Sequence, residues 1–230
     1  MAKNSARASV KAKQTSSNHK GHSVNNEILR SLPRKEFDAV FAVLEYVDLP
    51  VHTILNEAGG AITSCYFVES GLVSILSVLS QGKSVEVGLT GKEGFVGLPL
   101  VVGLKTSGAR GIVQIAATAF RVNAAKMASV LRQCPLLEKK LNRYAQALGA
   151  QSVQVAACNR LHEVDQRLAR WLLMCQDRIG GDFVPLTQEF LGHMLGTRRA
   201  SVTVAAGMLQ KAGLINYNRG KVRIVNRDQL

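Results

Sequence analysis

A short segment near the C-terminus gathers side chains that can hydrogen-bond to a polyanion. Arg198 and Arg199 stand at the start of a predicted helix, and Ser201 and Thr203 lie on its outward side. An arginine can donate two parallel hydrogen bonds to guanine in the major groove, and hydroxyl groups can donate to phosphates or base edges. These residue types in this arrangement indicate contact with double-stranded DNA.

The segment around these residues has helix-turn-helix spacing. Leu191 and Leu195 lie on one face of a first helix, and Gly192 between them lets a second helix approach closely. Gly196 suits the turn, because glycine adopts positive φ without a steric penalty. The second helix is predicted from about Arg199 to Ala212, with its apolar side chains inward.

A predicted β-hairpin follows and extends the motif to a winged helix-turn-helix. Ile215–Tyr217 and Lys221–Val225 are β-like runs around a turn. Thr187–Arg227 carries seven Lys or Arg against a single acid, Glu189, which favours salt-dependent binding to phosphates. The residues predicted to contact DNA are Thr187, Gln188, Thr197, Arg198, Arg199, Ser201, Thr203, Arg219 and Lys221.

The charge of the whole chain agrees with a nucleic-acid partner. The 230 residues carry a formal net charge of +13, with the excess at the two ends. Residues 1–22 contain five Lys or Arg, no acid and almost no large apolar side chain, which predicts a disordered basic tail. No apolar run approaches the roughly 20 residues that span a bilayer, so we expect a cytoplasmic protein without a membrane partner.

Catalysis and metal binding are not predicted. Cys65, Cys134, Cys158 and Cys175 do not lie at Cys-x-x-Cys spacing, so neither a zinc site nor an iron–sulfur cluster is expected. The chain shows no Ser/His/Asp set, carboxylate pair or phosphate-binding glycine loop in a suitable context. We therefore predict neither a cofactor nor an enzyme.

The middle of the chain has a β pattern. After a helical segment over Asn25–Leu44, short alternating runs with glycine turns indicate a small antiparallel roll or barrel. Ser80-Gln81-Gly82-Lys83 is a hairpin turn signal. The predicted strands are Cys65–Val68, Gly71–Val78, a run through Val85, Val87 and Leu89, Gly111–Ala116 and Ala119–Val122.

Helical spacing returns after the roll. Ala124–Arg132 is one predicted helix, and a second runs from Pro135 to about Asn159, roughly 37 Å long. A third helix is predicted over Val164–Ile179. The second has an apolar seam that predicts a dimer interface; packing within the protomer is the alternative. The interface residues predicted are Leu137, Leu141, Tyr144, Leu148 and Val155.

These elements predict an α+β chain. An N-terminal antiparallel β-roll, which resembles the cyclic-nucleotide-binding jelly roll, is followed by a long dimerisation helix and a C-terminal winged helix-turn-helix. The predicted parts are a tail over 1–22, a sensor roll over 23–134, a dimerisation helix and hinge over 135–162, and a DNA-binding domain over 163–230.

This order of parts resembles the Crp/Fnr superfamily of transcription regulators. The resemblance covers about Asn25 to Leu230, and its most specific stretches are Tyr66–Gly71, Gln166–Leu173 and Leu186–Leu209 with Gly213-Leu214-Ile215. It implies a homodimer on a near-palindromic operator, with one recognition helix in each half-site. Arg199 then occupies the base-reading arginine position. Ala200, Thr203 and Val204 depart from the usual residues, so we expect a different operator.

The sensor departs further from the resemblance. In cyclic-nucleotide members a Gly-Glu pair binds the ribose, and an Arg followed by Ser or Thr holds the phosphate. Gly97 is here followed by Leu98, and Arg110 by Gly111. Cyclic AMP is therefore not expected, and Gly97 and Arg110 are the remaining candidate effector residues. The roll either binds another small molecule or serves as a dimer scaffold.

Two partner questions stay open on the sequence. RNA polymerase is a candidate partner, since activation depends on polymerase contacts at a promoter. The alternative function is a small-molecule-binding regulatory module that acts through a protein partner.

Overall fold

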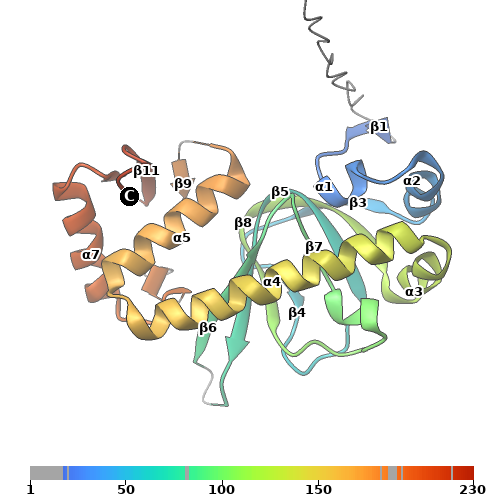
Figure 1. Ribbon diagram of the computed structural model, residues 1–230, viewed down its shortest axis with the longest axis horizontal. Coiled ribbons are helices and arrows are strands. Elements are labelled where there is room, and N and C mark those ends of the chain that lie inside the picture. Colours follow the sequence, from blue (N-terminus) through green and yellow to red (C-terminus); the bar gives the residue numbers. More distant parts are fainter. Residues whose placement is uncertain are drawn as a thin grey trace, which may run out of the picture.

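The chain forms a β-roll with small helices, a long helix and a C-terminal helical module with its own small sheet (Figure 1). This is a computed structural model, and it describes residues 18–19, 21–80, 83–181, 183–185, 191–192, 194–218 and 220–230. The predicted α+β class and order of parts are confirmed.

The roll is an antiparallel sheet in the order β3-β8-β5-β6, with β4 paired to β8 and β7 paired to β5. Its interior is an apolar cluster that includes Val68, Val73, Val96 and Val113. The strands are β3 (Glu45–Leu49), β4 (Ile54–Asn56), β5 (Ser64–Val78), β6 (Ser84–Thr90), β7 (Phe95–Val96) and β8 (Arg110–Asn123).

Two long strands replace four predicted short ones. β5 and β8 each run without a break, so the expected divisions within 65–78 and 111–122 were wrong. Register shifts between Val68 and Val73 absorb the irregular sequence, and Gly71 takes φ +77° there. A Cβ on Gly71 would lie 2.3 Å from the Ala116 carbonyl oxygen, so only glycine fits this bulge. Of the predicted turn at 80–83, Gln81 and Gly82 lie outside the described residues.

Small helices close one end of the roll. They are α1 (Glu27–Arg30), α2 (Arg34–Phe41), the 3₁₀ helix η1 (Leu98–Val102) and α3 (Ala124–Gln133), packed on a core that includes Phe41, Phe67 and Phe120. The side chain of Asn26 caps α1 by accepting from the Leu29 amide. The strand pair β1 (Asn18–His19) and β2 (His22–Ser23) precedes them, at the end of the segment predicted as tail, with Ser23 just beyond it.

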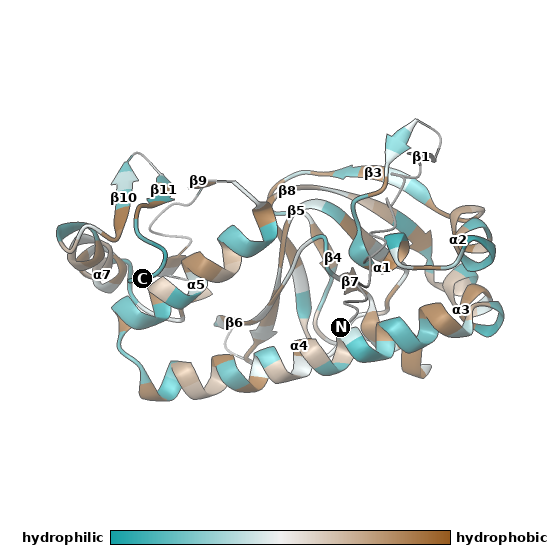
Figure 2. Cartoon of the chain, turned by 45° about the horizontal axis from the view of Figure 1, so that its top comes forward, coloured by the Kyte–Doolittle hydropathy of each residue, from teal (hydrophilic) through white to brown (hydrophobic). Residues whose placement is uncertain are grey.

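The long helix α4 (Pro135–Leu161) runs from these helices along the roll to the C-terminal module (Figure 2). It begins two residues after α3, at a proline in its first turn. The buried carboxylate of Glu36 caps it, accepting from the amides of Leu136 and Leu137 at 3.1 and 2.9 Å. One residue of α2 thus fixes where α4 starts.

The helix α5 (Val164–Ile179) turns back from the end of α4 and lies on the roll (Figures 1 and 2). Its predicted bounds are confirmed. A capping box between Glu163 and Gln166 starts it, and Gly180 ends it at φ +64°. The module continues with β9 (Phe183–Pro185), α7 (Arg199–Lys211), β10 (Ile215–Asn218) and β11 (Lys221–Ile224).

Candidate nucleic-acid interface

The helix α7 is the recognition helix of the predicted motif. Its inner side is apolar and buried, through Val202, Ala205, Ala206 and Leu209. Arg198 precedes the helix with extended backbone, φ −76° and ψ 145°. Of the predicted DNA contacts at this helix, Arg198, Arg199 and Thr203 are exposed, whereas Thr197 and Ser201 are half-buried.

The predicted turn between the two helices is confirmed where it is described. Gly196 has φ +58°, and Leu191 and Leu195 are buried. A Cβ on Gly192 would lie 3.1 Å from the carbonyl oxygen of Thr197 and 3.4 Å from the amide nitrogen of Arg199. The absence of a side chain at Gly192 therefore allows the first helix to pass close to the start of α7. Thr187 and Gln188 lie outside the described residues.

The wing has three strands, in the order β10-β11-β9. The β10–β11 hairpin was predicted; β9 was not, because three residues with one buried apolar side chain give no periodicity. The hairpin pairs Asn218 with Lys221, which places the exposed Lys221 at its tip. Arg219 lies outside the described residues.

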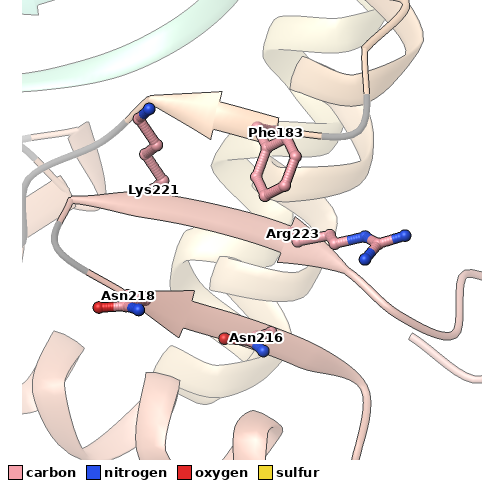
Figure 3. A pocket seen from close by; sticks show the side chains of 5 residues that line it. All are labelled: Phe183, Asn216, Asn218, Lys221 and Arg223. Carbon is pink, nitrogen blue, oxygen red and sulfur yellow. The ribbon is translucent and has the colours of Figure 1, made fainter.

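The solvent side of the wing sheet carries a row of polar and cationic side chains (Figure 3). Arg223 lies opposite Asn216 on one neighbour and Phe183 on the other, and its guanidinium carbon is 5.9 Å from the Phe183 ring centre. Together with Asn218 and Lys221 they line a hollow of 400 Å³. Strand alternation puts Arg223 on the same side as Lys221, a signal that the sequence prediction did not use for Arg223, Asn216 and Asn218.

A wider groove of 1240 Å³ separates the helix-turn-helix from the β5–β6 end of the roll. Arg198 and Ser201 line one side of it, and Lys83 and Val85 line the other. A Cβ on Gly196 would lie 3.2 Å from Val85. The start of the recognition helix therefore faces the roll of its own protomer across this groove.

The helix α5 holds the module to the roll. Trp171 is buried against Glu86 of β6, and Arg178 forms an ion pair of 2.8 Å with Glu93. Leu72, Leu76 and Leu89 of the roll belong to the same apolar cluster as the inner faces of α5 and α7. Roll and module thus share one core.

The two candidate effector residues, Gly97 and Arg110, have different neighbours in the roll. Gly97 has φ +116°, and a Cβ there would lie 2.6 Å from the Cys65 sulfur. Leu98, at the position of the missing glutamate, packs against the helical core. Arg110 pairs with Glu57 at 2.8 Å, and this ion pair lowers the pKa of the Glu57 carboxyl.

The predicted dimer seam of α4 faces the roll. Leu137 and Leu141 have no exposed surface and Val155 keeps 3%, so a second chain could bury almost nothing more of them. Tyr144 exchanges a hydrogen bond of 2.9 Å with Thr90, and Leu148 lies beside Gly88. Packing within the protomer, the alternative, describes Leu137, Leu141 and Val155, whereas Tyr144 and Leu148 are half-buried. The outward face of α4 carries Gly149, Ala150, Val153 and Ala157, all exposed.

No group of three or more possible metal-ligating side chains occurs among the described residues. All four cysteines are buried free thiols, and burial raises the pKa of Cys65 to about 12. Among those residues, no helix is long and apolar enough to cross a membrane.

Comparisons with known proteins agree with this geometry. The cyclic nucleotide-binding domain family matches residues 46–134, and the Crp-like helix-turn-helix domain family matches residues 166–230. No curated protein sequence matches the chain.

Solved structures share the fold at low sequence identity. The c-di-GMP responsive global regulator CLP of Xanthomonas campestris has a TM-score of 0.69 at 16% identity, over 84% of this chain and 99% of that one. FixK2 of Bradyrhizobium japonicum has a TM-score of 0.70 at 15% identity, over 81% and 95%. A CRP/FNR-family regulator of Thermus thermophilus has a TM-score of 0.65 at 20% identity, over 80% and 95%. With both domain families matched in this order, the chain belongs to the Crp/Fnr superfamily of transcription regulators, which are DNA-binding proteins and not enzymes.

Proposed function

We propose that the protein is a sequence-specific regulator that binds a near-palindromic operator in double-stranded DNA as a homodimer. The observation that carries this is the pair of exposed arginines, Arg198 and Arg199, at the N-terminal end of α7. Residues at that end of a recognition helix contact base edges in the major groove. Arg199 reads a guanine, and Arg198, Ser201 and Thr203 complete the contact with bases and phosphates.

The wing supplies phosphate contacts beside the recognition helix. Lys221 at the hairpin tip and Arg223 two residues along the same strand face are both exposed cations. Asn216 and Asn218 add amide donors on that face. Phosphate contacts fix the register of the protein on DNA without reading its sequence.

Because its partner is DNA, we expect the protein to act in the cytoplasm. RNA polymerase is a candidate partner at promoters.

The outward face of α4 is the surface we assign to the second protomer. Gly149, Ala150, Val153 and Ala157 form a stripe of small and apolar side chains, and Val153 is 72% exposed. Small residues let two helices pack closely along their length. This replaces the buried seam as the dimer surface, and two-fold symmetry then sets the recognition helices about 34 Å apart.

The roll does not bind cyclic AMP in this proposal. Leu98 cannot accept a hydrogen bond from a ribose hydroxyl, and Gly111 offers no hydroxyl to a phosphate. The guanidinium of Arg110 is already paired with Glu57. An alternative function, a module that binds a small molecule and acts through a protein partner, requires no operator.

The experiment is selection from a random duplex library at fixed salt, without added effector. Wild type and Arg199→Ala are compared, with Lys35→Ala, an exposed cation on α2, as the matched control. We expect wild type and Lys35→Ala to enrich the same near-palindromic site. Arg199→Ala should bind that site about 5- to 150-fold more weakly, the range for one bidentate arginine–guanine contact. Equal, sequence-independent binding by all three proteins would contradict the proposal and favour the alternative.

A further inference from the structure

The outward face of the recognition helix is unusually apolar for a surface that meets a polyanion. Ala200, Val204, Gly207 and Met208 follow one another at helical spacing, and all are exposed. Val204 keeps 64% of its surface in solvent and Met208 keeps 55%. No part of the protomer that the structure describes covers this face, so it faces whatever α7 binds.

Thr203 contributes to the same surface with its methyl group. Its hydroxyl donates a hydrogen bond of 3.1 Å back to the carbonyl oxygen of Arg199, one turn earlier. A threonine that bonds to the preceding turn directs the other branch of its Cβ away from the helix axis. The methyl groups of Thr203 and Val204 therefore both lie on the outward side of α7.

The charges around this patch identify the occupant. Arg198 and Arg199 lie at one end of α7 and Lys211 at the other, and the sequence of the helix contains no acidic residue. A ligand must therefore present negative charge at its edges and an apolar group at its centre. The DNA major groove has this arrangement, with phosphates along both rims and the thymine 5-methyl as an apolar group on its floor.

We propose that Val204, with the methyl group of Thr203 beside it, reads the 5-methyl group of a thymine in each half-site. The inference rests on the proposed DNA-binding function and names a base that the operator must contain. Val204 lies five residues beyond Arg199, about 7.5 Å along the helix. With base pairs about 3.4 Å apart, the thymine lies about two base pairs from the guanine that Arg199 contacts. Met208 lies a further turn along, beyond the base-contacting end of the helix.

The test uses the selected operator with single thymines replaced by deoxyuridine, which lacks only the 5-methyl group. Dissociation constants are measured for the full chain by fluorescence anisotropy at fixed salt. We expect one thymine per half-site at which the replacement weakens wild type about 3- to 5-fold, the value of one buried methyl group. Val204→Ala should bind thymine and deoxyuridine operators equally at that position. Met208→Ala changes a residue on the same exposed face, and it should still bind the thymine operator more tightly than the deoxyuridine operator, as wild type does.

The possible outcomes distinguish a failure of the thymine contact from a failure of the proposed DNA-binding function. An operator that is enriched and lost in Arg199→Ala, but that shows no deoxyuridine-sensitive position, leaves the function standing and overturns the thymine reading. Sensitivity that persists in Val204→Ala assigns the methyl contact to another residue and also overturns it. Failure to enrich any operator overturns both. Circular dichroism and thermal melting of Val204→Ala check that this surface change leaves the fold intact.

Discussion

The indole nitrogen of Trp171 donates a hydrogen bond of 2.8 Å to the carboxyl group of Glu86, which lies 85 residues earlier in the chain. The second carboxyl oxygen of Glu86 accepts from the Ser74 hydroxyl at 2.7 Å. Trp171 belongs to the DNA-binding module and the other two residues belong to the roll. All three side chains are buried, so these hydrogen bonds connect the module to the roll inside a shared apolar core.

The buried carboxyl group of Glu86 makes the stability of the fold depend on pH. Burial raises the pKa of Glu86 to about 8, against opposing effects of Ser74, Trp171, Arg170 and Arg178. The unfolded chain releases this proton near pH 4.5, so between about pH 4.5 and 8 the folded chain binds more protons. The free energy of unfolding therefore falls as the pH rises through this range. Burial of Glu69, whose pKa is raised to about 7, acts in the same direction.

Glu86→Gln should remove most of that dependence. The glutamine keeps an acceptor for the Trp171 indole and a donor for Ser74, and it carries no proton to lose. At pH 8 we expect Glu86→Gln to have a higher melting temperature than wild type. Its free energy of unfolding, measured with urea at several pH values from about 5 to 8.5, should vary less with pH than that of wild type. Trp171 is the single tryptophan, so its fluorescence reports this contact directly. Parallel pH profiles for the two proteins would rule out Glu86 as the cause.

Gly94→Ala should destabilise the packing of α4 on the roll. A Cβ there would lie 2.2 Å from the Tyr144 hydroxyl and 2.7 Å from a methyl carbon of Thr90, and the Tyr144 ring is itself packed against the apolar core. We expect a loss of about 1–3 kcal/mol, measured by urea unfolding. Gly207→Ala is the control, because an added methyl group would meet nothing within 4 Å there and the helix gains about 0.5–1 kcal/mol. Equal stability of Gly94→Ala and wild type would contradict this packing.

Val153→Asp should separate the dimer. An aspartate on the outward face of α4 would place two like charges together across the two-fold axis, and burying an unpaired charge is costly. Light scattering after size exclusion should give the protomer mass for Val153→Asp. Val51→Asp, an exposed valine in the β3–β4 turn, should keep the wild-type mass. A dimeric Val153→Asp would move the dimer surface elsewhere.

Addition of cyclic AMP should not change the melting temperature of the protein. A ligand that binds only the folded chain raises stability according to its concentration over its dissociation constant. With Leu98 and Gly111 in the two family positions, we expect no change of melting temperature at millimolar cyclic AMP. A rise of several degrees would show that the roll accepts the nucleotide without those contacts.

The sequence predicted elements whose signals are local. The helix Val164–Ile179 has a capping residue before it, a full apolar face and glycine after it, so both of its ends were predictable. The turn at Gly196 needs a positive φ that only glycine adopts without strain. The strands β3, β4 and β9 have three to five residues each, too few to show a period, and they were missed.

Contacts between distant segments were beyond the sequence. The α4 seam was correctly apolar, but its spacing could not distinguish a second chain from the roll that buries Leu137 and Leu141. Glu86 reads as an ordinary polar residue on an alternating strand, and nothing local indicates that Trp171 covers it. The candidate DNA contacts needed only helix geometry, whereas the groove opposite Arg198 depends on where β6 lies.

The apolar cluster that Leu72, Leu76 and Leu89 complete has a thermodynamic consequence. The roll and the DNA-binding module do not have separate hydrophobic cores, so the module cannot leave the roll without exposing leucine side chains to water. Each such side chain costs about 1.5–3 kcal/mol when fully exposed. That cost is an intrinsic bias toward the docked arrangement, and any signal that undocks the module to reorient the recognition helices must supply at least that much free energy.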